Sequence, residues 1–146
     1  YKFRTMGKEF DNQGNKIPDE ERTGKLGRFL RSTSLDELPE LWNIVLGDMS
    51  IVGPRPLFVE YLPYYTKEEA IRHEVRPGLT GLAQISGRNA LNWEDRLVLD
   101  VEYINLQSFS FDIKILFRTF YKVLTRSDVE IITGGNKRLD DERRTV

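Results

Sequence analysis

Two segments rich in glycine and proline, 47–56 and 75–88, set the strongest limits on what this chain can fold into. Glycine destabilises a helix interior by about 1 kcal/mol relative to alanine, and proline removes a backbone donor from a helix or a central strand. Neither segment can therefore hold a long regular element. We expect a stiff loop at 47–56, and turns with a possible β-hairpin at 75–88.

Helical patterns occupy most of the remaining chain, and residues 1–6 are typical of a short strand. We expect an α+β fold, a mostly helical single domain with a few short strands. The domain should span residues 1–132, and the polar tail at 133–146 should fray. The predicted helices are 18–30, 34–46, 61–74, 93–106 and 112–124.

The composition excludes several classes of protein. Lysine and arginine number 22 against 23 aspartates and glutamates, so the net charge is −1. Nucleic-acid binding usually requires a clear basic excess, so we expect no nucleic-acid partner. The chain has no cysteine and a single histidine, which excludes disulfides, thiol catalysis and a multi-histidine metal site. A bound metal would need oxygen ligands, which favours Mg²⁺ or Mn²⁺.

No apolar run approaches the roughly 20 residues that span a bilayer. The sequence opens on Tyr1 and runs directly into the predicted strand. We therefore expect a soluble fragment of a longer protein.

Two adjacent acids, Asp36 and Glu37, lie near the start of the helix predicted at 34–46. Such acids most often complement the helix dipole, which contributes about 0.3–1 kcal/mol each. The alternative is chemical, because an ionised Asp36 can attack phosphorus and form an acyl phosphate. Neighbouring side chains diverge by about 100° on a helix. One acid could therefore attack while the other holds a divalent cation.

Arginines near this pair could bind phosphate. Arg31 lies five residues before Asp36, at the end of a basic stripe that is otherwise typical of a solvated helix face. Arg55 lies between Pro54 and Pro56, which restrict the backbone, and its guanidinium offers paired donors to phosphate oxygens. Arg88 ends a glycine-containing loop that lacks the Walker and dinucleotide-binding patterns.

The helix predicted at 112–124 has an apolar stripe flanked by Lys114, Arg118 and Lys122. Core packing commonly explains such a stripe. A basic, aromatic flank equally suits a helix at a lipid surface. The sequence leaves both interpretations open.

A series of short, different motifs lies in a fixed order along most of the chain. Taken together, they resemble the bacterial sugar transferase family, the monotopic polyprenyl-phosphate phosphoglycosyl transferases. The resemblance extends over roughly residues 1–124. The motifs are Lys-Phe-Arg-Thr-Met at 2–6, Leu-Gly-Arg-Phe-Leu-Arg at 26–31, Ser-Leu-Asp-Glu-Leu-Pro at 34–39, Gly-Asp-Met-Ser at 47–50, Gly-Pro-Arg-Pro at 53–56, Arg-Pro-Gly-Leu-Thr-Gly at 76–81, Gly-Arg at 87–88 and Leu-Asp at 99–100.

The resemblance implies a two-step reaction that initiates bacterial glycan assembly (exopolysaccharide, capsule or O-antigen). Asp36 would attack the β-phosphate of a UDP-sugar and expel UMP, and polyprenyl phosphate would then accept the sugar phosphate. Glu37 would coordinate the Mg²⁺ cofactor. The substrate-binding residues would be Lys2, Arg31, Arg55, Arg88 and Asp100.

The same resemblance implies a membrane surface as partner, and a parent protein on the cytoplasmic face of the bacterial inner membrane. A homo-oligomer is possible. Family members carry a hydrophobic N-terminal segment that dips into the membrane, and this sequence does not contain one.

Other functions remain as alternatives. A haloacid-dehalogenase-type hydrolase needs an Asp-x-Asp motif at a strand end, whereas Glu37 and Leu38 follow Asp36. A metal-dependent glycosyltransferase also uses Asp-x-Asp, and only 100–102 and 128–130 approach that pattern. A membrane-associated assembly module, in which the two acids only cap a helix, is the non-enzymatic alternative.

Overall fold

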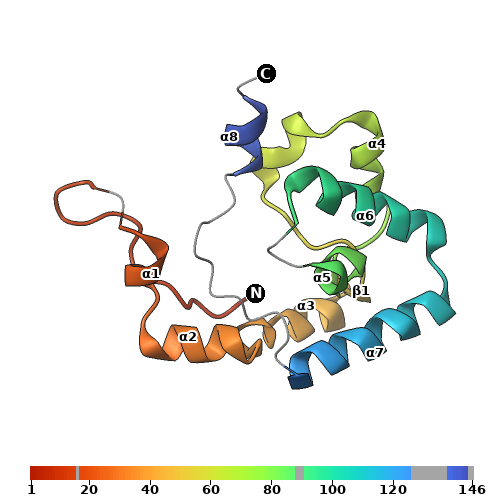
Figure 1. Cartoon of the computed structure of the whole chain (residues 1–146), viewed down its shortest axis with the longest axis horizontal. Coiled ribbons are helices and arrows are strands. Elements are labelled where there is room, and N and C mark those ends of the chain that lie inside the picture. Colours follow the sequence, from red (N-terminus) through yellow and green to blue (C-terminus); the bar gives the residue numbers. More distant parts are fainter. Residues whose placement is uncertain (16, 88–90, 126–137, 145–146) are drawn as a thin grey trace.

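The chain folds into helices around a two-stranded parallel sheet (Figure 1). The computed structural model describes residues 1–15, 17–87, 91–125 and 138–144. The expected α+β class with mostly helical content is confirmed. The elements are α1 (Asp19–Arg22), α2 (Lys25–Ser32), the 3₁₀ helix η1 (Leu35–Glu37), α3 (Glu40–Leu46), β1 (Ser50–Val52), the 3₁₀ helix η2 (Val59–Tyr64), α4 (Lys67–Ala70), the 3₁₀ helix η3 (Ile71–His73), β2 (Gly78–Thr80), α5 (Leu82–Ser86), α6 (Trp93–Leu106), α7 (Phe109–Thr125) and α8 (Leu139–Arg143).

The sheet joins the two glycine-rich segments. β1 and β2 run parallel, with Ser50 opposite Gly78. The hairpin expected at 75–88 is therefore wrong, and β1 lies inside the segment 47–56 that was expected to be a loop. Glycine permits the close approach, because a Cβ atom at Gly78 would collide with the backbone of Gly53. Parallel strands need a long crossover, which η2, α4 and η3 supply.

Residues 1–6 contain no strand, contrary to the prediction. The segment instead crosses α2, where a Cβ atom at Gly27 would collide with the carbonyl of Thr5. A backbone hydrogen bond from the Phe3 N–H to the Asp36 carbonyl (3.0 Å) joins it to η1. β-favouring side chains do not make a strand when no neighbouring strand is available for pairing.

Several predicted helices are divided into shorter elements. The 18–30 stretch forms α1 and α2, with Gly24 as the N-cap of α2. The 34–46 stretch forms η1 and α3, and Pro39 is the N-cap of α3, where its missing N–H is tolerated. The 61–74 stretch forms part of η2, then α4 and η3.

The long helices α6 and α7 match their predictions, and α7 extends beyond the predicted 112–124 at both ends. Tyr103 of α6 donates a hydrogen bond to Asp112 Oδ1 of α7 (2.9 Å). None of the described helices combines the length and hydropathy needed to cross a membrane. The core that these helices share with the sheet contains Val52, Ile85, Tyr103 and Ile115.

A second core cluster forms where α8 packs against η2 and α6. Arg143 of α8 also contacts both carboxylate oxygens of Glu69 on α4, each at 2.7 Å. The expectation that the tail frays is therefore wrong for residues 138–144. The cluster contains Tyr61, Trp93, Leu97 and Leu139.

We predict that Leu139→Ala lowers the free energy of unfolding by about 2–5 kcal/mol, because it leaves a cavity in this cluster. Urea denaturation measures the change. Leu26→Ala is the matched control, because the Leu26 side chain is 71% exposed, and its effect should stay below about 0.5 kcal/mol. Equally small effects in both variants would contradict the docking of α8.

Candidate active site

Asp36 and Glu37 lie on η1, in the short connection between α2 and α3. Ser34 adopts the left-handed conformation (φ 57°) that turns the chain after α2. Asp36 is only 4% exposed, and the Glu37 side chain is 22% exposed. The two acids are thus partly shielded from water in a 3₁₀ turn directly before α3.

Two cationic side chains converge on the acids. Lys2 Nζ lies 3.2 Å from Asp36 Oδ2 and 3.1 Å from Glu37 Oε1. Arg55 Nη2 donates to the same Glu37 oxygen at 2.9 Å. Burial alone would raise the pKa of Glu37, but the attraction of Arg55 and then of Lys2 outweighs burial and leaves that pKa below its ordinary value. Glu37 is therefore ionised at neutral pH.

The sheet positions Arg55. The residue follows β1 directly after Gly53 and Pro54, which are both buried. The Pro54 carbonyl accepts a hydrogen bond from the Gly78 N–H of β2 (2.9 Å). Lys2 lies on the N-terminal segment that crosses α2, and the Phe3 N–H of this segment donates to the Asp36 carbonyl.

Asp100 supports the site without contacting the two acids. It is 2% exposed and accepts a hydrogen bond from Arg72 Nη2 (2.9 Å), and the same Nη2 donates to the Arg55 carbonyl (2.6 Å). Burial raises the pKa of Asp100, and Arg72 opposes that rise. The sequence analysis missed Arg72, because its partner is 28 residues away and no local pattern marks it.

Arg96 is a second residue that the sequence analysis missed. It lies one turn before Asp100 on α6, with its guanidinium 4.6 Å from the Trp93 ring centroid. Burial and then the charge of Arg55 lower the pKa of Arg96. Arg72 and Arg96 thus both act on the buried carboxylate of Asp100, and Arg72 does so by direct contact.

Arg31 does not join this arrangement. Arg31 lies in the last turn of α2, where its side chain is exposed and makes no ion pair with a described acid. Arg88 lies outside the described residues. The structure therefore brings Lys2, Asp36, Glu37 and Arg55 together. Asp100 is connected to Arg55 through Arg72.

Two carboxylates suit a magnesium ion only where phosphate oxygens or water complete its coordination. Within the described ranges, no three acidic or histidine side chains converge as a metal site. Lys2 and Arg55 both contact Glu37 Oε1, so the other carboxylate oxygen can coordinate a cation. Magnesium commonly uses one or two carboxylates and completes its shell with phosphate oxygens and water.

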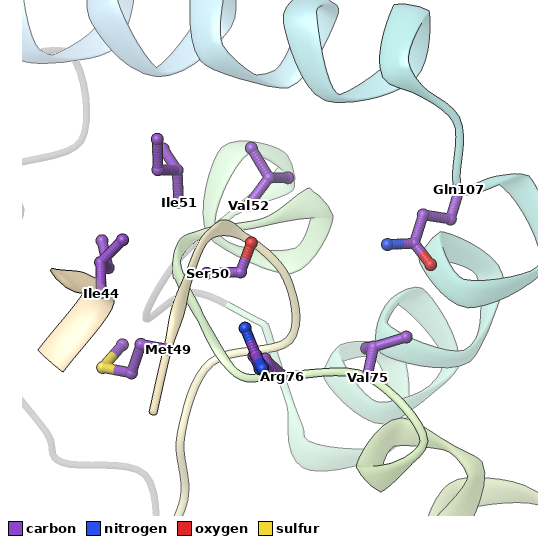
Figure 2. Close-up of a pocket in the computed structure, with 8 residues that line it drawn as sticks. All are labelled: Ile44, Met49, Ser50, Ile51, Val52, Val75, Arg76 and Gln107. Carbon is purple, nitrogen blue, oxygen red and sulfur yellow. The ribbon is translucent and has the colours of Figure 1, made fainter. Parts of the chain in front are cut away.

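A pocket of about 490 Å³ lies beside β1, at a different place from the acids (Figure 2). Its polar lining consists of Ser50, Arg76 and Gln107, and it has no acidic side chain. We place the candidate active site at Asp36 and Glu37 because the charged groups converge there.

Comparison with known proteins identifies the class. Residues 1–126 match the family described as bacterial sugar transferase. The chain therefore belongs to the bacterial sugar transferase family.

Individual relatives share 41–55% identity with the chain. The Bacillus subtilis protein named uncharacterized sugar transferase EpsL is 55% identical over 130 residues, covering 89% of this chain and 64% of its own length. The undecaprenyl-phosphate galactose phosphotransferase of Salmonella typhimurium is 43% identical, over 76% of this chain and 23% of that protein. The UDP-glucose:undecaprenyl-phosphate glucose-1-phosphate transferase of Klebsiella pneumoniae is 41% identical, over 84% and 28%. The chain thus spans only part of these relatives.

We predict that Arg55→Gln raises the pKa of Glu37 more than Lys2→Gln does. Arg55 is the stronger of the two attractions, and burial then acts with less opposition. Carbon-13 NMR titration of the Glu37 carboxyl measures both changes. Lys8→Gln removes an exposed charge and is the control, which should leave the pKa of Glu37 unchanged. An unchanged Glu37 pKa in all variants would exclude control by these cations.

Proposed function

We propose that this chain is the catalytic part of a phosphoglycosyl transferase that moves a sugar phosphate from a UDP-sugar to polyprenyl phosphate. The supporting observation is the shielded acid pair Asp36–Glu37, held by Lys2 and Arg55. The names of two relatives include undecaprenyl phosphate, and one also includes UDP-glucose. Another relative is named exopolysaccharide production protein ExoY, which supports a role in initiating a bacterial glycan.

In the first step, a carboxylate oxygen of Asp36 bonds to the β-phosphorus of the UDP-sugar. The bond from that phosphorus to the bridging oxygen breaks, and its electron pair leaves with UMP. Lys2 and Arg55 stabilise the charge that develops on the phosphoryl oxygens. This division of labour suits phosphoryl transfer, which depends mainly on positioning and charge stabilisation.

In the second step, a phosphate oxygen of polyprenyl phosphate attacks the aspartyl-linked phosphorus. The bond to Asp36 breaks, and the carboxylate is regenerated as the polyprenyl-diphosphate sugar departs. A bound Mg²⁺ would neutralise charge on the diphosphate, and the second carboxylate oxygen of Glu37 would hold it. Asp36 and Glu37 thus have separate roles.

We predict that Asp36→Asn abolishes UMP release from every member of a UDP-sugar panel in the presence of Mg²⁺. The parent chain should gain the mass of a sugar phosphate, and the variant should gain none, because the amide cannot act as the nucleophile. Intact-protein mass spectrometry and a UMP assay measure these outcomes. Glu37→Gln is the comparison and should raise the Mg²⁺ requirement without moving the adduct. An adduct that persisted in the Asp36→Asn variant would exclude Asp36 as the nucleophile.

We also propose that α7 lies against a membrane surface at the cytoplasmic face. Ile115 of α7 is buried in the core, whereas Phe117 and Tyr121 are 72% and 68% exposed. Trp42 and Val45 of α3 are likewise 58% and 73% exposed. In Figure 1, α3 and α7 lie along the lower edge of the view. Core packing therefore accounts for only part of the apolar stripe, and a lipid surface would cover the rest.

We predict that Lys114→Gln with Arg118→Gln weakens binding to anionic liposomes. Each cation near an anionic surface contributes about 1 kcal/mol, so the loss should be about 2 kcal/mol, roughly thirtyfold in the partition coefficient. Liposome co-sedimentation measures it. Lys8→Gln with Lys67→Gln removes the same charge from exposed sites outside α7 and is the control. Equal binding by both double variants, or none by the parent chain, would contradict the proposal.

A further inference from the structure

The buried guanidinium of Arg72 joins the loop of Arg55 to helix α6. Arg72 Nε and Nη2 donate to Asp100 Oδ2 at 3.1 and 2.9 Å. The same Nη2 donates to the Arg55 carbonyl at 2.6 Å. The side chains of Arg72 and Asp100 are only 3% and 2% exposed. The contact therefore fixes the backbone of Arg55 from inside the protein, on the side away from solvent.

The position of the Arg55 guanidinium depends on this anchored backbone. Its side chain is 38% exposed and contacts Glu37 through one nitrogen, Nη2. A long, half-exposed side chain has many rotamers. The position of its guanidinium therefore depends on how firmly the backbone of the same residue is held. Pro54 and Pro56 restrict the backbone locally, and the hydrogen bond from Arg72 fixes the same loop relative to α6.

Helix α8 contacts α4, which leads into the element that carries Arg72, and α6, which carries Asp100. Arg143 holds Glu69 on α4, which continues directly into η3 and Arg72. Leu139 packs with Leu97 on α6, one turn before Asp100. This helix lies beyond the residues 1–126 that match the family. Through these contacts α8 links the helix that precedes η3 to the helix that carries Asp100.

We propose that Arg72 is a positioning residue for Arg55, and that α8 holds the Arg72-bearing segment in place. Arg72 needs the guanidinium geometry for this role, because it must donate to a carboxylate and to a backbone carbonyl at once. A lysine could still neutralise Asp100, but its one nitrogen would replace both Nε and Nη2 and could not keep all three of their contacts. The consequence for catalysis rests on the proposed function, whereas the effect on the side chain of Arg55 does not.

The first experiment compares Arg72→Lys with the parent chain by nitrogen-15 NMR of the Arg55 Nε–Hε group. Its signal is identified by its disappearance in Arg55→Gln. The parent should give a single sharp signal, and Arg72→Lys should shift and broaden it. Far-ultraviolet circular dichroism should stay unchanged. An unaltered Arg55 signal in a folded Arg72→Lys variant would overturn the positioning role.

The second experiment is a double-mutant cycle on UMP release. Arg72→Lys alone should reduce the rate about tenfold or more, whereas in the Arg55→Gln background it should change the rate by less than about twofold. Equal effects in both backgrounds would overturn the proposal, because Arg72 would then act independently of Arg55. If the parent chain releases no UMP, the proposed function fails, and the NMR result still decides the positioning role.

The part played by α8 is tested by Arg143→Gln, with Arg144→Gln as the matched control directly after the same helix. Both arginines contact Tyr64 of η2, Arg143 at the Tyr64 carbonyl and Arg144 at the Tyr64 hydroxyl, but of the two only Arg143 contacts Glu69 of α4. Arg143→Gln should shift the Arg55 signal in the same direction as Arg72→Lys, and Arg144→Gln should leave it unchanged. An unchanged signal in Arg143→Gln, or equal shifts in both variants, would overturn the role of α8.

Discussion

The backbone contact between Gly53 and Gly78 determines where Arg55 and Arg72 can lie. A Cβ atom on either glycine would collide with the opposite backbone, so the parallel pairing of β1 and β2 depends on both. Once the strands are paired, the chain that leaves β1 passes directly into Arg55. The crossover must then return to β2 through η3, which carries Arg72. A steric requirement at two glycines therefore brings Arg55, the proposed phosphate-binding arginine, and Arg72 into one region.

Two separate apolar clusters stabilise the sheet and the helices around it, and the buried ion pair of Arg72 and Asp100 lies between elements of the fold that these clusters hold. One cluster lies under the sheet and the other lies between η2, α6 and α8. The ion pair of Arg72 and Asp100 joins the crossover to α6. Burying two charges is costly unless their geometry is good and their remaining donors are satisfied. Arg72 meets this condition in part by donating to the Arg55 carbonyl, so the same contact stabilises the fold and orders the site.

The sequence predicted the features that depend on local pattern. Helix α6 was predicted over its observed span, because its apolar spacing is uninterrupted, and Lys2, Asp36, Glu37 and Arg55 belong to recognisable motifs. Features that depend on distant partners could not be predicted in this way. The parallel pairing of the strands, the absence of a strand at 1–6 and the docking of Leu139 all depend on which surfaces meet in three dimensions. Arg72 belongs to the same group.

The different surroundings of Asp36 and Glu37 give a physical reason for their separate proposed roles. Lys2 and Arg55 both contact Glu37 Oε1, and their attraction keeps the pKa of this acid below its ordinary value. Asp36 contacts only Lys2 among the described cations, through Oδ2. Its other oxygen accepts no hydrogen bond from a described residue, so its lone pairs are available for attack on phosphorus. Glu37, which contacts two cations, is suited to the proposed role of coordinating a metal ion. Asp36, which contacts one, is suited to the proposed role of forming a bond to phosphorus.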